Sequence, residues 1–400
     1  MHTPSTFPKE KRPPTVFNQI EIEVARRAEL GQKVIALHVG DAYLPLPEQL
    51  LTSVPDEDRL YGTGLNRYGD AMGDPALREV LLMKVRARNN LPAEGIDCVQ
   101  VTGGATGALY AGFRRLLEPN AEVLTLAPYW SILRVVADTA GVKLVEAPFF
   151  DLTVDGLDKS APTRQFDQAE ALKPFLTPKT GGIYINTPSN PTGIVLSRSV
   201  LEKVAAFAKE HDLWVFSDEA YEDYIYDASE HISIGSLPGM FERTLSIHTF
   251  SKCFGASGMR IGYVTAPAPV IAELHRGVVG SHYQAGRYDM LMAWRGMRRF
   301  DRIVETFRND YASTWQWVRD NLKADCLPCV SGFYFFLKLG PKLGELPAME
   351  QVFKMLDAGA VLSPGEYFGN EYKGWARLCF TVVPPDEVKE GIERLNELVF

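Results

Sequence analysis

The sequence predicts an α/β protein with a large domain built on a mainly parallel, seven-stranded sheet covered by helices, plus a smaller α/β domain. Seven short segments are rich in apolar and β-branched residues, which is typical of strands buried on both faces. Stretches with helical spacing, such as residues 199–210, separate these segments, and such alternation predicts parallel strands. The predicted strands are residues 98–102, 122–127, 142–147, 182–186, 213–217, 244–249 and 261–265.

The length predicts two domains. The chain has 400 residues, of which 46% are hydrophobic, and a chain of this length is too long to fold around a single compact core. The small domain is expected to combine the N- and C-terminal parts of the chain, with helices over about 290–322 and 385–398. A separate polar segment, residues 151–179, is expected to be a surface insertion. We assign 1–45 to an N-terminal arm and part of the small domain, 46–290 to the large domain and 291–400 to the small C-terminal domain.

Composition excludes several classes of protein. No run approaches the roughly 18 apolar residues of a membrane span, and the first ten residues lack the apolar core of a signal peptide. A net charge of −8 without a sustained basic run argues against a nucleic-acid partner. Five cysteines, an odd number, suit a reducing compartment. We therefore expect a cytoplasmic protein.

Glycines follow the first predicted strand and open a helix. The run is Gly103-Gly104-Ala105-Thr106-Gly107. Free N–H groups and the helix dipole make such a helix start an anion site. The run lacks the lysine of a nucleotide-binding P-loop, and its glycine spacing does not fit a dinucleotide site.

Polar side chains end the next central strands. Strand 182–186 runs into a turn in which two prolines and a glycine fix the backbone, so that Asn190 is presented rigidly. Asp218 follows strand 213–217, at the carboxyl end where α/β sheets bind ligands.

Lys252 lies between the last two predicted strands, 244–249 and 261–265. A lysine in that place is partly desolvated, which lowers the ammonium pKa and favours the neutral amine that forms a Schiff base. The alternative is a surface lysine on a glycine-rich loop.

Together these segments resemble the fold-type I pyridoxal phosphate enzymes, specifically the class I/II aminotransferase family that includes aspartate aminotransferases. The resemblance runs from about residue 15 to the C-terminus. Its most specific pieces stand in the order and at the spacing of the family: Asn190-Pro191-Thr192-Gly193, Ser217-Asp218-Glu219-Ala220-Tyr221, and Ser251-Lys252 with Arg260 eight residues on.

The resemblance implies roles around the ring of pyridoxal 5'-phosphate. Lys252 would form the aldimine and then move the proton at the α-carbon. Asp218 would pair with the pyridine nitrogen, with a helix cap or turn acid as its alternative. Asn190 and Tyr221 would bind the phenolic oxygen, although either residue alone is more often structural. Trp130 would stack on the ring, with Tyr129 second and a core aromatic as the alternative.

The resemblance also implies a phosphate site and a substrate site. The phosphate would be bound by Gly104, Ala105, Thr106, Thr249 and Arg260, and by Tyr68 of a neighbouring subunit, which implies a homodimer with shared active sites. Arg377 would bind the substrate α-carboxylate with Asn190 nearby, and a solvated strand arginine is the alternative. Gly40 would allow close approach of the substrate.

Two departures from the family pattern leave the substrate open. Dicarboxylate-specific members use a second cation for the distal carboxylate, and residues 276–283 do not show one clearly. His282, Tyr283, Gln284 and Arg287 could line the substrate mouth, but each fits an ordinary helix or interface residue better. Residues 40–47 also differ from the usual acidic-proline run, which points to a divergent or biosynthetic specialist.

No metal site is expected. Cys326 and Cys329 have C-x-x-C spacing without a second pair, so we interpret them as structural. The seven histidines form no metal pattern. His248 is the one nearest Lys252 in sequence, and we interpret it as a packed strand residue.

The resemblance implies an aminotransferase that moves the amino group of an L-amino acid to a 2-oxo acid by a ping-pong mechanism. One alternative is a pyridoxal phosphate-dependent lyase or cyclase on the same scaffold, because the ring-binding residues would be identical. Another is a ligand-sensing regulator, which the absence of spare length for a DNA-binding domain disfavours.

Overall fold

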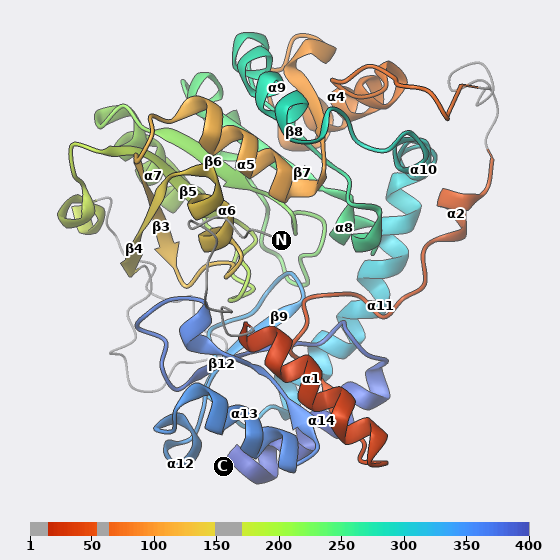
Figure 1. Cartoon of the computed structure of the whole chain (residues 1–400), viewed down its shortest axis with the longest axis vertical. Helices are drawn as coiled ribbons and strands as arrows, with labels where there is room; N and C mark the ends of the chain where they lie inside the picture. Colours follow the sequence, from red (N-terminus) through yellow and green to blue (C-terminus); the bar gives the residue numbers. More distant parts are fainter. Residues whose placement is uncertain (1–14, 54–63, 149–169, 400) are drawn as a thin grey trace, which may run out of the picture.

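The computed structural model describes residues 15–53, 64–148 and 170–399 (Figure 1). Its larger part is built on one seven-stranded sheet with the order β2-β8-β7-β6-β5-β3-β4. Only β8 runs antiparallel to its neighbours β7 and β2. Each predicted strand forms one strand of this sheet, so the predicted fold class is confirmed. The strands are β2 (Val99–Thr102), β3 (Glu122–Ala127), β4 (Lys143–Pro148), β5 (Thr180–Asn186), β6 (Trp214–Asp218), β7 (Thr244–Thr249) and β8 (Gly262–Thr265).

Helices cover the sheet because its strands are apolar on both faces. Every residue of β2, β3, β7 and β8 is buried. The ring of Phe113 on one covering helix meets Phe216 of β6 edge to face, with centroids 4.7 Å apart. The covering helices are α4 (Pro75–Asn89), α5 (Gly104–Leu116), α6 (Leu133–Ala140), α7 (Arg198–Glu210) and α9 (Ala268–His282).

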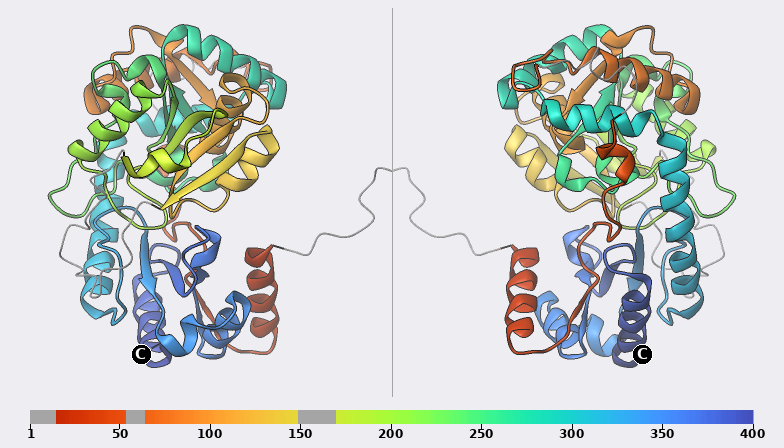
Figure 2. Two further views of the ribbon diagram at one scale, coloured as in Figure 1. Left: turned by 90° about the vertical axis from the view of Figure 1, so that its left-hand side faces the viewer. Right: turned by 90° about the vertical axis from the view of Figure 1, so that its right-hand side faces the viewer.

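The smaller part joins the two ends of the chain. β1 (Ile35–Ala36) pairs in parallel with β10 (Ala360–Val361). β12 (Trp375–Cys379) lies between β11 (Ser363–Pro364) and β9 (Tyr334–Lys338) in an antiparallel sheet. The helices of this part are α1 (Val16–Glu29), α12 (Pro341–Gly344), α13 (Ala348–Asp357) and α14 (Pro385–Val399). Figure 2 shows α1 and the long α11 (Phe300–Asn321) on opposite sides of it. The domain bounds 1–45, 46–290 and 291–400 stay a prediction.

The prediction of one long helix over 290–322 is wrong. The structure has α10 (Arg287–Met297) and α11 (Phe300–Asn321), and Arg299 between them is not helical, with φ −134° and ψ 22°. Arg299 donates to the carbonyl of Gln49 at 3.0 Å, within the short helix α2 (Glu48–Leu51). The break between the two helices thus coincides with a tertiary contact, and the local sequence pattern did not predict it.

Two predicted segments lie wholly or mostly outside the described residues. These are the beginning of the N-terminal arm and most of the insertion at 151–179, of which residues 170–175 form a 3-10 turn. Within the described ranges no helix combines the length and the apolar character that crossing a membrane requires.

Candidate active site

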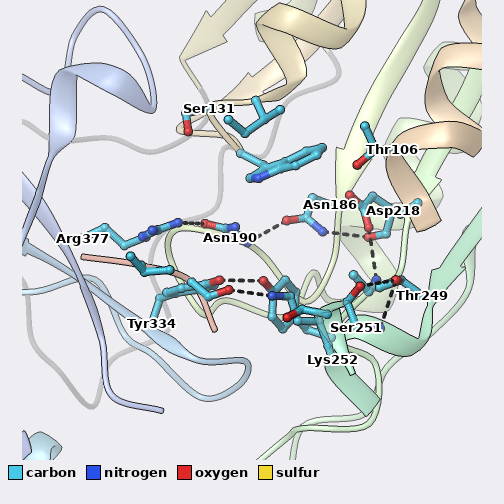
Figure 3. Close-up of a pocket in the computed structure, with 18 of the residues that line it drawn as sticks. Thr106, Ser131, Asn186, Asn190, Asp218, Thr249, Ser251, Lys252, Tyr334 and Arg377 are labelled. Carbon is cyan, nitrogen blue, oxygen red and sulfur yellow. Dashed lines mark hydrogen bonds between the residues drawn. The ribbon is translucent and has the colours of Figure 1, made fainter. Parts of the chain in front are cut away.

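A cavity of about 390 Å³ lies where the carboxyl ends of β5, β6 and β7 face the start of α5 and the smaller part of the chain. All the predicted site residues line it except Gly104 and Tyr68. Those that it brings together are Gly40, Ala105, Thr106, Trp130, Asn190, Asp218, Tyr221, Thr249, Lys252, Arg260 and Arg377. Figure 3 shows Arg377 and Asp218 at opposite sides of the cavity.

Lys252 enters the cavity from α8 (Phe250–Cys253), the short helix directly after β7. Its Nζ donates to the carbonyl oxygen of Gly40 at 2.7 Å. Burial lowers the pKa of Lys252, and the positive charges of Arg377 and Arg260 act in the same direction. The amine is therefore prepared to act as a nucleophile or a base.

Asp218 ends β6 as a buried carboxylate. Tyr184 donates its hydroxyl to Oδ2 at 2.9 Å, and the backbone N–H of Ala220 donates to Oδ1 at 3.2 Å. Burial raises the pKa of Asp218 to about 6. No described residue forms an ion pair with this carboxylate, so it is available to a protonated ligand nitrogen.

The guanidinium of Arg377 is buried, and not all of its hydrogen-bond donors have a partner. It donates from Nη2 to the carbonyl of His38 at 2.7 Å and from Nη1 to Oδ1 of Asn190 at 3.0 Å. Its Nε is buried and has no hydrogen-bond partner. The guanidinium carbon lies 4.5 Å from the ring centroid of Tyr334, which fixes its plane. Such a group can bind a carboxylate.

The opposite end of the cavity is an anion site. The helix α5 begins without a side-chain cap, so its first N–H groups are free. Gly104 has φ +73°, and a Cβ there would lie 2.9 Å from Nη2 of Arg260. Arg260 has no carboxylate partner among the described residues and donates only to the carbonyl of Ser257. Gly104 thus lets Arg260 approach the helix start, although it does not itself line the cavity.

Gly40 fits the cavity for a reason that differs from the predicted one. A Cβ at Gly40 would lie 2.3 Å from the hydroxyl oxygen of Tyr334. That hydroxyl is 2.7 Å from the hydroxyl of Tyr221, and both rings are buried. Glycine is therefore needed to admit a protein side chain, whatever the substrate requires.

The two candidate stacking residues point to different places. Trp130 lines the cavity, whereas Tyr129 is buried outside it and donates its hydroxyl to Glu146 at 2.9 Å. Of these two residues, Trp130 is thus the one available to a ligand.

Tyr68 and the residues 282–287 do not line this cavity. Tyr68 is 82% exposed, and its ring meets that of Tyr283 with centroids 5.0 Å apart. Gln284 accepts from the N–H of Gly69 at 2.9 Å, and Arg287 donates to the carbonyl of Gly64. None of His282, Tyr283, Gln284 and Arg287 lines the cavity.

A buried cluster of charged side chains lies at β7 and the segment that follows β6. His248 bonds through Nδ1 to Glu222 at 2.9 Å and stacks on Tyr263. Atoms of Glu219, Glu222 and His248 come within 4.8 Å of one another, as metal ligands do. Lys84 however donates to Glu222, so the protein supplies its own cation there. Cys326 and Cys329 are both buried, and neither forms a disulfide.

Sequence reasoning missed several lining residues. Asn186 ends β5 beside Asp218 and donates to its carbonyl at 2.8 Å. It carried the same signal as Asp218, a polar residue at the carboxyl end of a central strand. Tyr334, Phe17 and Glu21 also line the cavity, and their places depend on contacts between distant segments, for which the sequence offered no local signal.

The residues present fit pyridoxal phosphate. The cavity offers a helix start with a free arginine for a phosphate, a buried unpaired carboxylate for a pyridinium nitrogen, and a lysine with lowered pKa for an aldehyde. The fold and this site together define an α/β enzyme with an activated lysine at the carboxyl edge of its sheet.

The chain belongs to the family of class I and II aminotransferases, which it matches over residues 32–395. It is 32% identical to an aspartate aminotransferase of Pyrococcus abyssi, covering 96% of each chain. It is 30% identical to an aromatic-amino-acid aminotransferase of Thermococcus litoralis, covering 94% of this chain and 95% of that relative. A solved double mutant of Thermus thermophilus aspartate aminotransferase matches with a TM-score of 0.85 at 25% identity, covering 97% of each chain. The predicted resemblance is confirmed, and members of this family use pyridoxal phosphate.

Proposed function

We propose that this chain is a pyridoxal phosphate-dependent aminotransferase that moves the amino group of an L-amino acid to a 2-oxo acid by a ping-pong mechanism. The observation that carries the proposal is one cavity in which Lys252, with its lowered pKa, faces the buried carboxylate of Asp218 and the unsatisfied guanidinium of Arg377. The named relatives support transamination and do not favour the lyase or cyclase alternative.

Each side chain has a role in this proposal. The bound cofactor supplies an electron sink for the substrate α-carbon. Lys252 holds the cofactor and moves the proton, and Asp218 keeps the ring nitrogen protonated. Arg377 and Asn190 orient the α-carboxylate, while Tyr221 donates toward the ring oxygen and Trp130 covers the ring face. The phosphate is held by the start of α5 at Gly104, Ala105 and Thr106, and by Thr249 and Arg260.

The proposal includes a homodimer in which Tyr68 completes the partner's phosphate site. Three aromatic side chains support it, because Tyr68, Tyr283 and Tyr288 are 82%, 45% and 62% exposed on the described part of the chain. A cytoplasmic location and a biosynthetic role stay predictions.

The test is the absorption spectrum of the cofactor-loaded protein during addition of single L-amino acids. We expect a few of them to convert the cofactor to pyridoxamine phosphate with release of one 2-oxo acid, and Lys252→Ala to abolish this conversion. A circular dichroism spectrum of Lys252→Ala like that of the wild type would show that the variant folds. Release of ammonia without pyridoxamine phosphate would favour the lyase or cyclase instead.

A further inference from the structure

The first helix contributes one wall of the cavity, and that wall indicates a substrate class within the proposed function. Phe17 and Glu21 are four residues apart on α1, so they share one face of the helix. Both line the cavity together with Val39 and Ile132. In the proposed function, this wall is the part of the site left for the substrate side chain.

One charged side chain that lines the cavity has no role in the proposed function. Among the described residues that line it, the cations are Lys252, Arg260 and Arg377, and the proposed function uses all three. Of the two lining carboxylates, Asp218 is used as well. Glu21 remains as an unassigned negative charge, and no lining cation of the described chain is left to bind a second substrate carboxylate.

Glu21 is held in place from behind. Its Oε1 is 2.9 Å from Nε2 of His38, whose side chain is fully buried. Burial lowers the pKa of His38, although the nearby charge of Glu21 opposes this shift. Since Nδ1 of His38 has no partner, the tautomer that donates from Nε2 satisfies the contact. The neutral imidazole therefore orients the carboxylate without cancelling its charge.

His38 also links Glu21 to the carboxylate-binding arginine. The carbonyl of His38 accepts from Nη2 of Arg377, while its ring contacts Glu21. A substrate bound at Arg377 would thus extend past the apolar side chains of Phe17, Val39 and Ile132 toward a fixed negative charge. Glu21 is 58% exposed with no other partner among the described residues, so it can reach a ligand.

We propose that this site selects basic amino acids as amino donors, with Glu21 as the specificity-determining residue for the cationic end of their side chain. The apolar wall accommodates the methylene stem of such a substrate, and Glu21 pairs with its cation. A distal carboxylate would instead face a like charge, which disfavours dicarboxylates. This inference rests on the proposed function.

A binding experiment separates the inference from catalysis. The probes are 5-guanidinopentanoate, hexanoate and glutarate, which carry a carboxylate for Arg377 but no amino group. Calorimetry on the cofactor-loaded protein should give the tightest binding for the guanidino probe and the weakest for glutarate. Glu21→Gln should weaken the binding of the guanidino probe on the order of fivefold, which is the scale of a partly screened ion pair. The same substitution should weaken the binding of hexanoate less. Glu29→Gln, at the exposed end of the same helix, is the matched control and should change none of the three.

Conversion of the cofactor gives the second measurement. The wild type should convert with L-arginine faster than with L-norleucine, and with L-glutamate slowest, while Glu21→Lys should reverse the order of arginine and glutamate. Equal loss of all three probes in Glu21→Gln, or a preference of the wild type for glutamate, would overturn the inference. If no amino acid converts the cofactor, the proposed function fails, while Glu21-dependent binding of the guanidino probe would still support the charge preference.

Discussion

Asp218 shows most clearly how one buried side chain affects both stability and chemistry. A carboxylate with no ion-pair partner is costly to bury, and burial raises its pKa from 3.8 to about 6. Between these values the folded cofactor-free chain binds more protons at this site than the unfolded chain. Its stability therefore falls as the pH rises through that window, and a bound pyridinium would offset the cost.

A pH series on the cofactor-free protein tests this. We expect Asp218→Asn to gain stability relative to the wild type between pH 4 and pH 6, by about 3 kcal/mol in all, since each pKa unit corresponds to about 1.4 kcal/mol. Urea unfolding at each pH measures the difference. The difference curve is needed because burial raises the pKa of Asp223 to about 6 as well. Parallel stability curves for the two proteins would contradict the assignment.

Single residues also mark the limit of sequence-based prediction. Lys252, Asp218 and Asn190 were predictable because each follows a predicted strand and stands in a short run that resembles a motif of the family. Glu21 was not, because its importance arises from contact with His38, 17 residues away, and from the docking of α1 against the cavity. The need for glycine at position 40 could not be predicted either, because it arises from the close approach of the Tyr334 hydroxyl group.

At the scale of elements, packing overrode local pattern in few places. The seven strands were predictable because apolar, β-branched runs between helical stretches leave few alternatives. The break between α10 and α11 was not, because both sides carry helical spacing and the bend coincides with the tertiary contact of Arg299 with Gln49. Likewise, the pairing of α4 with the segment after β6 depends on Lys84 and Glu222, which are far apart in sequence.

That pairing predicts a large effect from a single substitution. Lys84 and Glu222 are 5% and 10% exposed, so Lys84→Met should deprive a buried carboxylate of its lysine partner and lower the free energy of unfolding by about 3 kcal/mol, although His248 and Asn89 still contact that carboxylate. Lys143→Met removes a pair whose lysine is 72% exposed and should cost less than about 1 kcal/mol. Urea unfolding of both variants measures the contrast, and equal losses would show that the buried pair is not a structural tie.

At the scale of the whole molecule, the cavity lies between the large sheet and the smaller part, and both contribute chemistry. Lys252 and Asp218 come from the sheet, whereas Arg377 and Glu21 come from the smaller part. In the proposed function the two parts together bind the substrate, and a second copy of the chain completes the phosphate site.

The proposed dimer gives a prediction at this scale. The chain should sediment as a dimer, and Tyr68→Phe should weaken cofactor binding about tenfold without dissociating it, because one hydrogen bond to a charged group is lost. Tyr288→Phe, another exposed tyrosine, is the control and should leave cofactor affinity unchanged. A monomeric protein with full cofactor affinity would contradict shared sites.

The most direct test of the central claim follows the nitrogen atom. The cofactor-loaded protein is given an L-amino acid labelled with ¹⁵N at the α-amino group, is freed of small molecules, and is then given an unlabelled 2-oxo acid. Mass spectrometry should find the label in the amino acid made from that 2-oxo acid, as a ping-pong aminotransferase requires. Label recovered as ammonia, or no label retained by the protein between the two additions, would contradict the account.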